Sequence, residues 1–532
     1  MLPEDKFFRS DDKKMVWQRY CGFLDLSLQE FMEIQKQLLL EQLELVARSP
    51  LGERITKGAK PKTVKEFRQL VPLTTYDDYA PYLDSQQKDA LAMKPCFWVH
   101  TSGRGGKYKW APWSPRAEEL ECRDIIGAFI LASATKRGEV NLQPGARVLT
   151  NLPPRPYVTG TIISSMAQRI SFNPIPPIEI SETMEFQERI EKGFTMALRT
   201  GIDFFCSLSG VLIRVGEGFA EEAGRMKFSF SMLHPLVLFR LFRAWLRSKT
   251  EKRGLLPKDL WPVKALISWG TDAAIYKDKI AYYWGETPYE LYAATELGFI
   301  AAQAWNKRGM TFFADSVFLE FIPEAECIKS REDKEYQPAT VLLDEVEEGK
   351  IYEIVITNFY GMPFLRYRLG DLIKIVALRD EETGVNLPQM VFQARVADII
   401  DIAGFAILDE KTVWQAIANT GIRYEDWTAR KEYEHNEPIL HLYIELRESA
   451  RANDVKDLVN EALKAIDQGY KDLDSMLEVQ PLRVTCLSKG TFQRYFEEKK
   501  RGGVDLAQLK PAHMNTSDAV IRDLLRLSEE VQ

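Results

Sequence analysis

The chain has 532 residues, of which 45% are hydrophobic and 28% charged, with a formal net charge of −7 and a pI of about 5.6. This length predicts about two to four domains, or one large domain with a satellite, and the composition is typical of a globular protein with a substantial core. The acidic balance, without a long run of Lys and Arg, argues against a nucleic-acid-binding protein. The N-terminal segment MLPEDKFFRSDDKK is charged where a secretory signal would be apolar, so we do not expect secretion.

The six cysteines are scattered, without a CxxC pair or another short spacing. This pattern predicts free thiols in a reducing cytoplasm and argues against a zinc site. The five histidines show no metal-ligand spacing either. A metal bound by this chain would therefore have oxygen ligands, which points to magnesium.

The first half of the chain predicts alternating helices and buried strands. Apolar residues recur with the helical period over residues 26–48, which indicates an amphipathic helix. ARVLTNL (146–152) and PVKALISW (262–269) are typical of short buried strands, and helical stretches separate them. This alternation predicts an α/β layered body. The apolar run 204–213 is too short to cross a bilayer, so we expect a core segment and no membrane span.

The stretch HPLVLFRLFRAWLRSK (234–249) is both apolar and basic. One interpretation is a helix that lies on a membrane surface. The other is a helix packed on the core, with arginines that extend their charged ends to solvent. We expect the second arrangement.

From residue 311 the pattern changes to successive strands. The strand-like segments are TFFADSVFLEFIP (311–323), ATVLLDE (339–345), GKIYEIVITN (349–358), FLRYRLGDLIKIV (364–376) and PQMVFQA (388–394). They predict an antiparallel sheet or distorted barrel that is appended to the α/β body. After about residue 394 a smaller α+β unit follows. Its expected elements are a helix near 410–419, a hairpin turning at 435–438, a helix through 455–466, the strand 482–487 and a last helix from 490.

The segment TSGRGGKYKWAP (101–112) combines two hydroxyls, three glycines and two lysines. Such a loop suits a polyphosphate, because glycine backbone N–H groups and hydroxyls donate hydrogen bonds while ammonium groups offset charge. It is not a Walker loop, since no Gly-Lys-Ser/Thr closes it. A surface loop without a ligand explains the composition equally well.

Four further motifs follow in the chain: WGTD (269–272), YAATE (292–296), YRLGD (367–371), and ARVAD (394–398) with Gly404 beyond it. Each has a plain structural explanation, because Thr-Glu often caps a helix and Arg-Leu-Gly-Asp often forms a turn. Together with residues 101–112, these motifs stand in the chain order of one enzyme type. The same order of motifs includes three longer segments: FFADSVFLEFIP, FLRYRLGDLIKIV and KGTFQRYF…LAQLKPAH.

With these motifs, the chain resembles the adenylate-forming superfamily of acyl-CoA synthetases, luciferases and peptide-synthetase adenylation domains. Within it, the chain is most similar to the acyl-acid-amido synthetases, which join plant hormones such as auxin or jasmonate to amino acids. The resemblance implies an α/β fold with a large N-terminal adenylate-forming domain, 1–394, of α/β layers plus a distorted antiparallel β-barrel. A small mobile α+β C-terminal domain, 395–532, would follow.

The resemblance also implies a reaction that uses ATP and Mg²⁺. A carboxylic acid would be activated as acyl-AMP, and the acyl group would pass to an amino acid or amine. The partners would thus be small molecules, and the sequence leaves the oligomeric state and the identity of the acid open. An acyl-CoA ligase of the phenylacetate-CoA-ligase type is one alternative, because Asp401-Ile-Ala-Gly404 resembles a stretch lining the thioester tunnel of CoA ligases. A non-catalytic nucleotide-binding regulator is a second alternative.

The resemblance implies that the phosphates of ATP are bound by Thr101, Ser102 and Gly103, with Lys109 or Lys107 beside them. Within the motif 292–296, Tyr292 would contact the adenine, Thr295 the α-phosphate and Glu296 the magnesium ion.

Asp371 would accept hydrogen bonds from the ribose hydroxyls. Arg395 would lie at the domain junction near ribose or phosphate, and Lys510 would bind the reacting oxygens. Lys510, Thr295 and Arg395 are the candidate catalytic residues. The acyl pocket would be walled by Tyr157, Gly160, Phe205, Gly270 and Thr271, although turn and core packing explain these residues equally well.

The chain departs from the superfamily pattern at a few positions. Arg104 replaces a Ser or Thr, and Ala293 replaces a glycine. These two changes motivate the regulator hypothesis. Asp401 and Ala397 differ near the expected hinge, and Lys510 lacks the arginine that usually follows.

Overall fold

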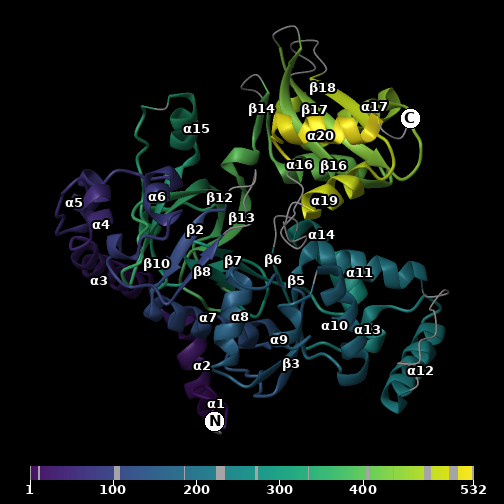
Figure 1. The fold of residues 1–532 in the computed structure, drawn as a ribbon, viewed down its shortest axis with the longest axis horizontal. Helices are drawn as coiled ribbons and strands as arrows, with labels where there is room; N and C mark the ends of the chain where they lie inside the picture. Colours follow the sequence, from purple (N-terminus) through teal and green to yellow (C-terminus); the bar gives the residue numbers. More distant parts are fainter. Residues whose placement is uncertain are drawn as a thin grey trace. The chain divides into compact units, whose positions relative to one another are not determined.

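The computed structural model describes residues 2–9, 12–100, 108–184, 186–222, 234–269, 273–333, 335–402, 406–434, 437–471, 481–501 and 513–529. The chain divides into two compact units (Figure 1). The first comprises Met1–Leu369 and Ile373–Phe392, and the second Gly370–Leu372 and Gln393–Gln532. Within the described residues, no helix has both the length and the apolarity that crossing a membrane requires.

The first unit begins with helices. They are α1 (Asp5–Phe8), α2 (Lys13–Cys21), α3 (Leu28–Val46), α4 (Pro50–Thr56), α5 (Val64–Leu70) and α6 (Tyr76–Leu83). The periodicity of 26–48 correctly predicted α3, whose N-terminus is fixed by a capping box between Ser27 and Glu30. The two-stranded hairpin of β1 (Phe97–His100) and β2 (Trp110–Trp113) follows.

An eleven-stranded sheet forms the centre of this unit, in the order β10-β11-β12-β13-β9-β8-β7-β6-β5-β3-β4. Its strands are β3 (Ala146–Thr150), β4 (Phe172–Ile175), β5 (Phe204–Leu208), β6 (Ala265–Trp269), β7 (Tyr289–Ala294), β8 (Gly298–Gln303), β9 (Met310–Phe312), β10 (Val317–Pro323), β11 (Ile351–Asn358), β12 (Tyr367–Ala377) and β13 (Gln389–Arg395). Strands β4, β3, β5, β6 and β7 are parallel neighbours.

Helices alternate with these strands, as the sequence predicted. They are α7 (Pro115–Ser133), α8 (Val158–Ala167), α9 (Ile178–Ser181), α10 (Phe186–Thr200), α11 (Ser209–Glu222), α12 (Pro235–Thr250), α13 (Pro257–Leu260), α14 (Ala273–Trp284) and α15 (Glu324–Glu332). Strand β7 pairs in parallel with β6 and antiparallel with β8. The antiparallel strands therefore continue the α/β sheet directly, and they begin before residue 311.

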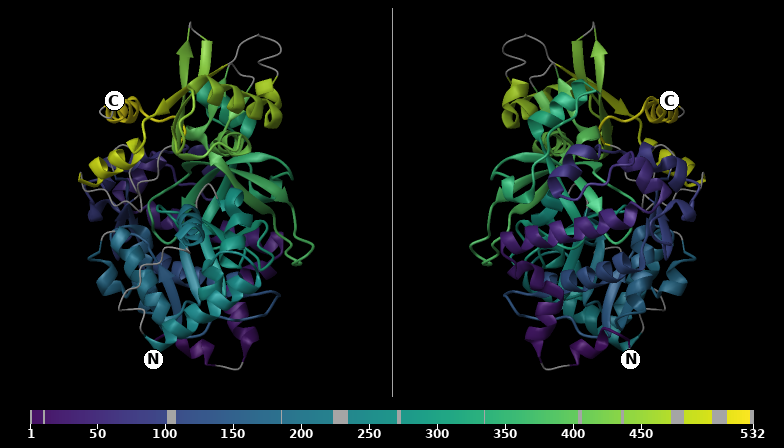
Figure 2. Two further views of the ribbon diagram at one scale, coloured as in Figure 1. Left: turned by 90° about the vertical axis from the view of Figure 1, so that its right-hand side faces the viewer. Right: turned by 90° about the vertical axis from the view of Figure 1, so that its left-hand side faces the viewer.

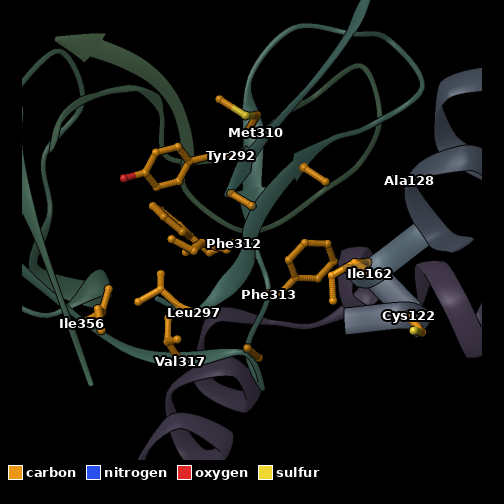
Figure 3. Close-up of a cluster of buried hydrophobic side chains, with 14 of the residues drawn as sticks. Cys122, Ala128, Ile162, Tyr292, Leu297, Met310, Phe312, Phe313, Val317 and Ile356 are labelled. Carbon is orange, nitrogen blue, oxygen red and sulfur yellow. The ribbon is translucent and has the colours of Figure 1, made fainter. Parts of the chain in front are cut away.

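The main core lies between this sheet and the helices around it. Figure 3 shows part of the core, with Tyr292, Leu297, Met310 and Phe312 in one buried cluster. A second core holds Phe205, Trp261 and Trp284. These aromatic side chains bury large apolar areas, which stabilises the layers that carry the loops.

The second unit is an α+β module. It contains β14 (Ile400–Ile402), β15 (Ala406–Leu408), α16 (Glu410–Asn419), β16 (Tyr424–Glu434), β17 (Glu437–Leu446), α17 (Ala452–Ile466), β18 (Leu482–Leu487), α19 (Thr491–Arg501) and α20 (Asp518–Glu529). Strands β16 and β17 are antiparallel, and β18 joins β17 in parallel. The long β16–β17 hairpin can be followed in Figure 2. The predicted helix 410–419 and strand 482–487 are confirmed.

Candidate nucleotide site

The proposed phosphate loop connects the two strands of a hairpin. Strands β1 and β2 pair antiparallel, with His100 opposite Trp110. Thr101, Ser102, Gly103 and Lys107 lie outside the described residues, which resume at Tyr108. The paired strands fix where the loop leaves and rejoins the fold.

His100 anchors the start of this loop. It is buried, and its backbone N–H donates to the carbonyl of Pro156 at 3.3 Å. The His100 ring lies 4.2 Å from the ring of Tyr108 and 4.5 Å from that of Tyr157, measured between centroids. The hairpin is thereby attached to the segment before α8, where the sequence places one wall of the acyl pocket.

The residues proposed for the acyl pocket occupy different surroundings. Tyr157 is buried beside His100, whereas Phe205 is buried in the second core near Trp284, with ring centroids 5.0 Å apart. A Cβ on Gly160 would lie 2.5 Å from the carbonyl oxygen of Pro153, so close backbone packing explains this glycine. Gly270 and Thr271 lie outside the described residues.

Thr295 and Glu296, together with Leu297, form the turn of the β7–β8 hairpin, in which Ala294 pairs with Gly298. Gly298 has a φ of +85°, and a Cβ there would lie 2.2 Å from Oε2 of Glu121 on α7. Both the left-handed backbone and the close approach require glycine. The turn is therefore packed directly against α7.

Three side chains from other elements hold this turn. Trp113 Nε1 on β2 donates to the carbonyl of Thr295 at 3.2 Å, and Asn358 Nδ2 on β11 donates to that of Glu296 at 3.3 Å. Glu121 Oε2 accepts from the N–H of Phe299 at 2.8 Å. These three hydrogen bonds to protein side chains fix the position of the turn.

The side chain of Glu296 is directed by Tyr367. The carboxylate is buried, and its Oε1 accepts a hydrogen bond from the Tyr367 hydroxyl at 3.2 Å. Burial first, and then the charge of Glu296, raise the pKa of Tyr367, so the phenol stays protonated and donates. Within the described part of the chain, Glu296 Oε2 accepts no hydrogen bond from a protein group.

This arrangement fits a magnesium ion. No group of three or more His, Cys, Asp or Glu side chains among the described residues could hold a metal by itself. Mg²⁺ commonly binds one or two protein carboxylates and takes its other oxygens from phosphates and water. The Oε2 atom of Glu296 has the chemistry for such a single protein ligand.

Lys109 lies where the loop returns to β2. Its Nζ is 5.3 Å from the centroid of the Tyr76 ring on α6. The Tyr76 hydroxyl donates to Asp84 at 2.9 Å and accepts from the N–H of Trp110 at 2.6 Å. Burial, Asp84 and, more weakly, the charge of Glu296 raise the pKa of Tyr76. The charge of Glu296 thus acts on Tyr76, which is hydrogen-bonded to the first residue of β2.

Tyr292 lies on β7, whereas Asp371 and Arg395 lie on β12 and β13, which are separated from β7 in the sheet by β9 and β8. Tyr292 on β7 is buried, with its ring centroid 6.2 Å from that of Phe392. Asp371 Oδ1 on β12 lies 3.2 Å from Nε of Arg395 on β13, within the second unit. Asp371 is nearly buried and Arg395 half-exposed. Lys510 lies outside the described residues.

The sequence did not identify the residues that support the Glu296 turn. Tyr367 was part of a recognised motif, but only Asp371 in that motif was assigned a role. Trp113, Asn358 and Glu121 carried no signal, because each contacts the turn across a long sequence separation.

Three family models match the chain in order: the GH3 family N-terminal domain at residues 21–173, the central domain at 310–395 and the C-terminal domain at 410–519. Jasmonoyl–L-amino acid synthetase GH3.5 of Oryza sativa subsp. japonica is 30% identical over 224 residues, covering 39% of this chain and only 37% of that protein. Indole-3-acetic acid-amido synthetase GH3.17 of Arabidopsis thaliana is 22% identical, with 90% of each chain covered.

Solved structures show the same fold. The AtGH3.15 acyl acid amido synthetase in complex with 2,4-DB has a TM-score of 0.68 and 16% identity, with 99% of this chain and 97% of that chain covered. A 2-hydroxyisobutyryl-CoA ligase in the postadenylation state has a TM-score of 0.60 and 13% identity, with coverage of 94% and 92%. The expected α/β adenylate-forming fold, with a large N-terminal and a smaller C-terminal part, is confirmed.

Proposed function

Because the chain belongs to the GH3 family, we propose that it is an ATP-dependent ligase that activates a carboxylic acid as acyl-AMP and transfers the acyl group to an amino acid or amine. The observation that carries this proposal is the buried Glu296 carboxylate, fixed on a hairpin turn with one oxygen bound by Tyr367. The similar proteins reported above, a jasmonoyl–L-amino acid synthetase and an indole-3-acetic acid-amido synthetase, support the same reaction class.

The chemistry requires activation because a carboxylate is a poor electrophile. Its oxygen attacks the α-phosphorus of ATP, a P–O bond to pyrophosphate breaks, and the acyl carbon gains AMP as a leaving group. The amine then attacks this carbon, AMP departs, and the amine loses a proton. Magnesium, when bound, would offset phosphate charge, and Glu296 Oε2 would hold it.

The remaining assignments form part of the proposal. Thr101, Ser102, Gly103 and Lys109 would bind the phosphates, and Tyr292 would line the adenine. The buried ring of Tyr292 on β7 lies in the strand that leads into the Glu296 turn, which supports this placement.

Thr295 would contact the α-phosphate, because it precedes Glu296 in the same turn. Asp371 would accept bonds from the ribose hydroxyls while Arg395, held 3.2 Å from it, adds a cation for ribose or phosphate. Lys510 would bind the reacting oxygens, and the small C-terminal domain, 395–532, would move it into position. Tyr157, beside the hairpin base, is the pocket residue with the most support.

We also propose a cytoplasmic location, supported by six cysteines that are all free thiols.

An assay with a panel of carboxylic acids tests the proposed activity directly. Pyrophosphate release is measured with ATP, magnesium and single carboxylic acids, and then amino acids, amines and CoA are added separately to the acid that reacts. We expect acid-dependent pyrophosphate release and an amide product. Discharge by CoA alone would make the protein a CoA ligase, and tight ATP binding without release would favour a regulator.

A further inference from the structure

Helix α12 is firmly attached to the first unit along one side. Val237, Ala244 and Ser248 are buried, and the helix packs against α13 and α10. Arg240 Nη1 donates to the carbonyls of Ala197 and Leu198, both at 3.0 Å. The packed helix that the sequence predicted is therefore present.

The opposite side of α12 is apolar and exposed, which the sequence did not predict. Phe239 is 65% exposed and Phe242 58%, although large aromatic side chains are normally covered. Leu236 is exposed in the first turn of α12. The other exposed large apolar residues of the helix fall within about 120° of its circumference; they are Leu238, Phe239, Phe242, Trp245 and Leu246. We call this set the outer face of α12. The rings of Phe242 and Trp245 stack at 6.2 Å.

The charge of α12 is opposite to that of the whole chain. The helix contains Arg240, Arg243, Arg247 and Lys249 and no acidic residue, although the chain has a net charge of −7. Arg247 is paired with Glu251 at 3.1 Å. Burial first, and then the nearby charges of Arg147 and Arg243, lower the pKa of Arg240.

We propose that the outer face of α12 binds the surface of a lipid bilayer that contains anionic headgroups, with the helix lying in the plane of the interface. Aromatic and leucine side chains on one side and arginines beside them are the features of interfacial helices. Anionic headgroups complement the exposed cations Arg243 and Lys249, which each favour binding near a charged membrane surface. A symmetric contact with a second copy would instead bring two basic helices together.

Flotation of the full chain with vesicles tests this proposal. Vesicles of equimolar phosphatidylcholine and phosphatidylserine are compared with vesicles of phosphatidylcholine alone. We expect the protein to float with the anionic vesicles and added salt to weaken binding. The double variant Phe239→Gln/Phe242→Gln should bind about a hundredfold more weakly, because two exposed rings lose their apolar contact with lipid. Arg243→Glu should weaken binding about tenfold.

A matched control is available on α5, where Leu70 is 53% exposed and Lys65 is exposed. The variant Leu70→Gln/Lys65→Glu should float like wild type. All variants should keep the wild-type unfolding temperature, because the changed side chains are exposed. No flotation of the wild type, or unchanged flotation of the double variant, would overturn the proposal. Dimerisation in vesicle-free solution that Phe239→Gln/Phe242→Gln abolishes would assign the face to a second copy instead.

Discussion

The proposed magnesium ligand Glu296 is oriented by Tyr367. The phenol binds Oε1 and stays neutral because burial and the neighbouring charge raise its pKa. The carboxylate therefore remains oriented while Oε2 is available to a hard cation. Rigid orientation before binding reduces the entropy lost when substrate and metal arrive.

Replacing Glu296 by Gln should raise the magnesium concentration needed for half-maximal pyrophosphate release by about tenfold or more, because a neutral amide oxygen is a weaker ligand for a hard cation. The measurement is a magnesium titration at saturating ATP and acid. Glu44→Gln, on the exposed side of α3, is the control and should behave as wild type. An unchanged magnesium requirement in Glu296→Gln would remove Glu296 from the metal site.

His513 forms a buried ionic cluster in the second unit. Its Nδ1 lies 2.7 Å from Glu410 and its Nε2 3.0 Å from Asp426, and its ring stacks on Trp427 at 4.5 Å. Burial alone would lower the pKa of His513, but the two carboxylates outweigh it and raise the pKa to about 10. The imidazolium is thus charged in the folded state, and it joins α16, β16 and the segment before α20.

His513→Gln should lower the free energy of unfolding by about 3 kcal/mol at neutral pH, because two buried carboxylates lose their cation. The raised pKa means that the wild-type advantage is fully present below pH 6.5 and is lost as the pH rises through about 10. Thermal unfolding of both proteins across this range measures the effect. A difference in unfolding temperature that stays constant or widens toward pH 10 would contradict the assignment.

At the scale of elements, hairpins carry two of the proposed ATP-binding segments. The β1–β2 connection contains the glycine-rich loop, and the β7–β8 turn contains Thr295 and Glu296. Trp113 connects the two hairpins by its bond to Thr295. A change in the packing of one hairpin should therefore alter the other.

Gly298→Ala should destabilise the protein by roughly 2–4 kcal/mol, because alanine disfavours the positive φ and its Cβ would clash with buried Glu121. Adenylation should fall together with the unfolding temperature. Gly218→Ala in α11 is the control, since its Cβ meets no atom within 4 Å, and it should stabilise the helix by about 0.5–1 kcal/mol. Wild-type stability and activity of Gly298→Ala would show that the turn tolerates another conformation.

Local pattern was sufficient to predict several elements. The 3.6-residue period identified α3 to within two residues at each end, and apolar runs identified β3 and β6. The Tyr367–Glu296 contact spans 71 residues and the Trp113–Thr295 contact 182, so no local pattern reports them. Periodicity also showed that α12 has apolar positions, but which side is covered depends on α10 and α13.

At the scale of the whole molecule, one sheet carries all the described strands between residues 146 and 395. Its parallel half and its antiparallel half meet at β7, the strand that contains Tyr292 and leads into the Glu296 turn. Ligands of open α/β sheets commonly bind at the carboxyl ends of strands, where the order of strands changes. The position of YAATE at the end of β7 agrees with this rule. The pairing of β7 with one strand of the parallel half and one strand of the antiparallel half of the sheet could not be predicted from the local sequence pattern, because the pattern does not indicate which strands become neighbours.

The central claim is that a carboxylate oxygen attacks the α-phosphorus of ATP. The most direct test supplies the acid selected by the panel with both carboxylate oxygens labelled as ¹⁸O, together with ATP and the amine acceptor, and determines the label in the products by mass spectrometry. We expect AMP that carries one ¹⁸O from the acid, with unlabelled pyrophosphate. Unlabelled AMP, or ADP with label in phosphate, would contradict it.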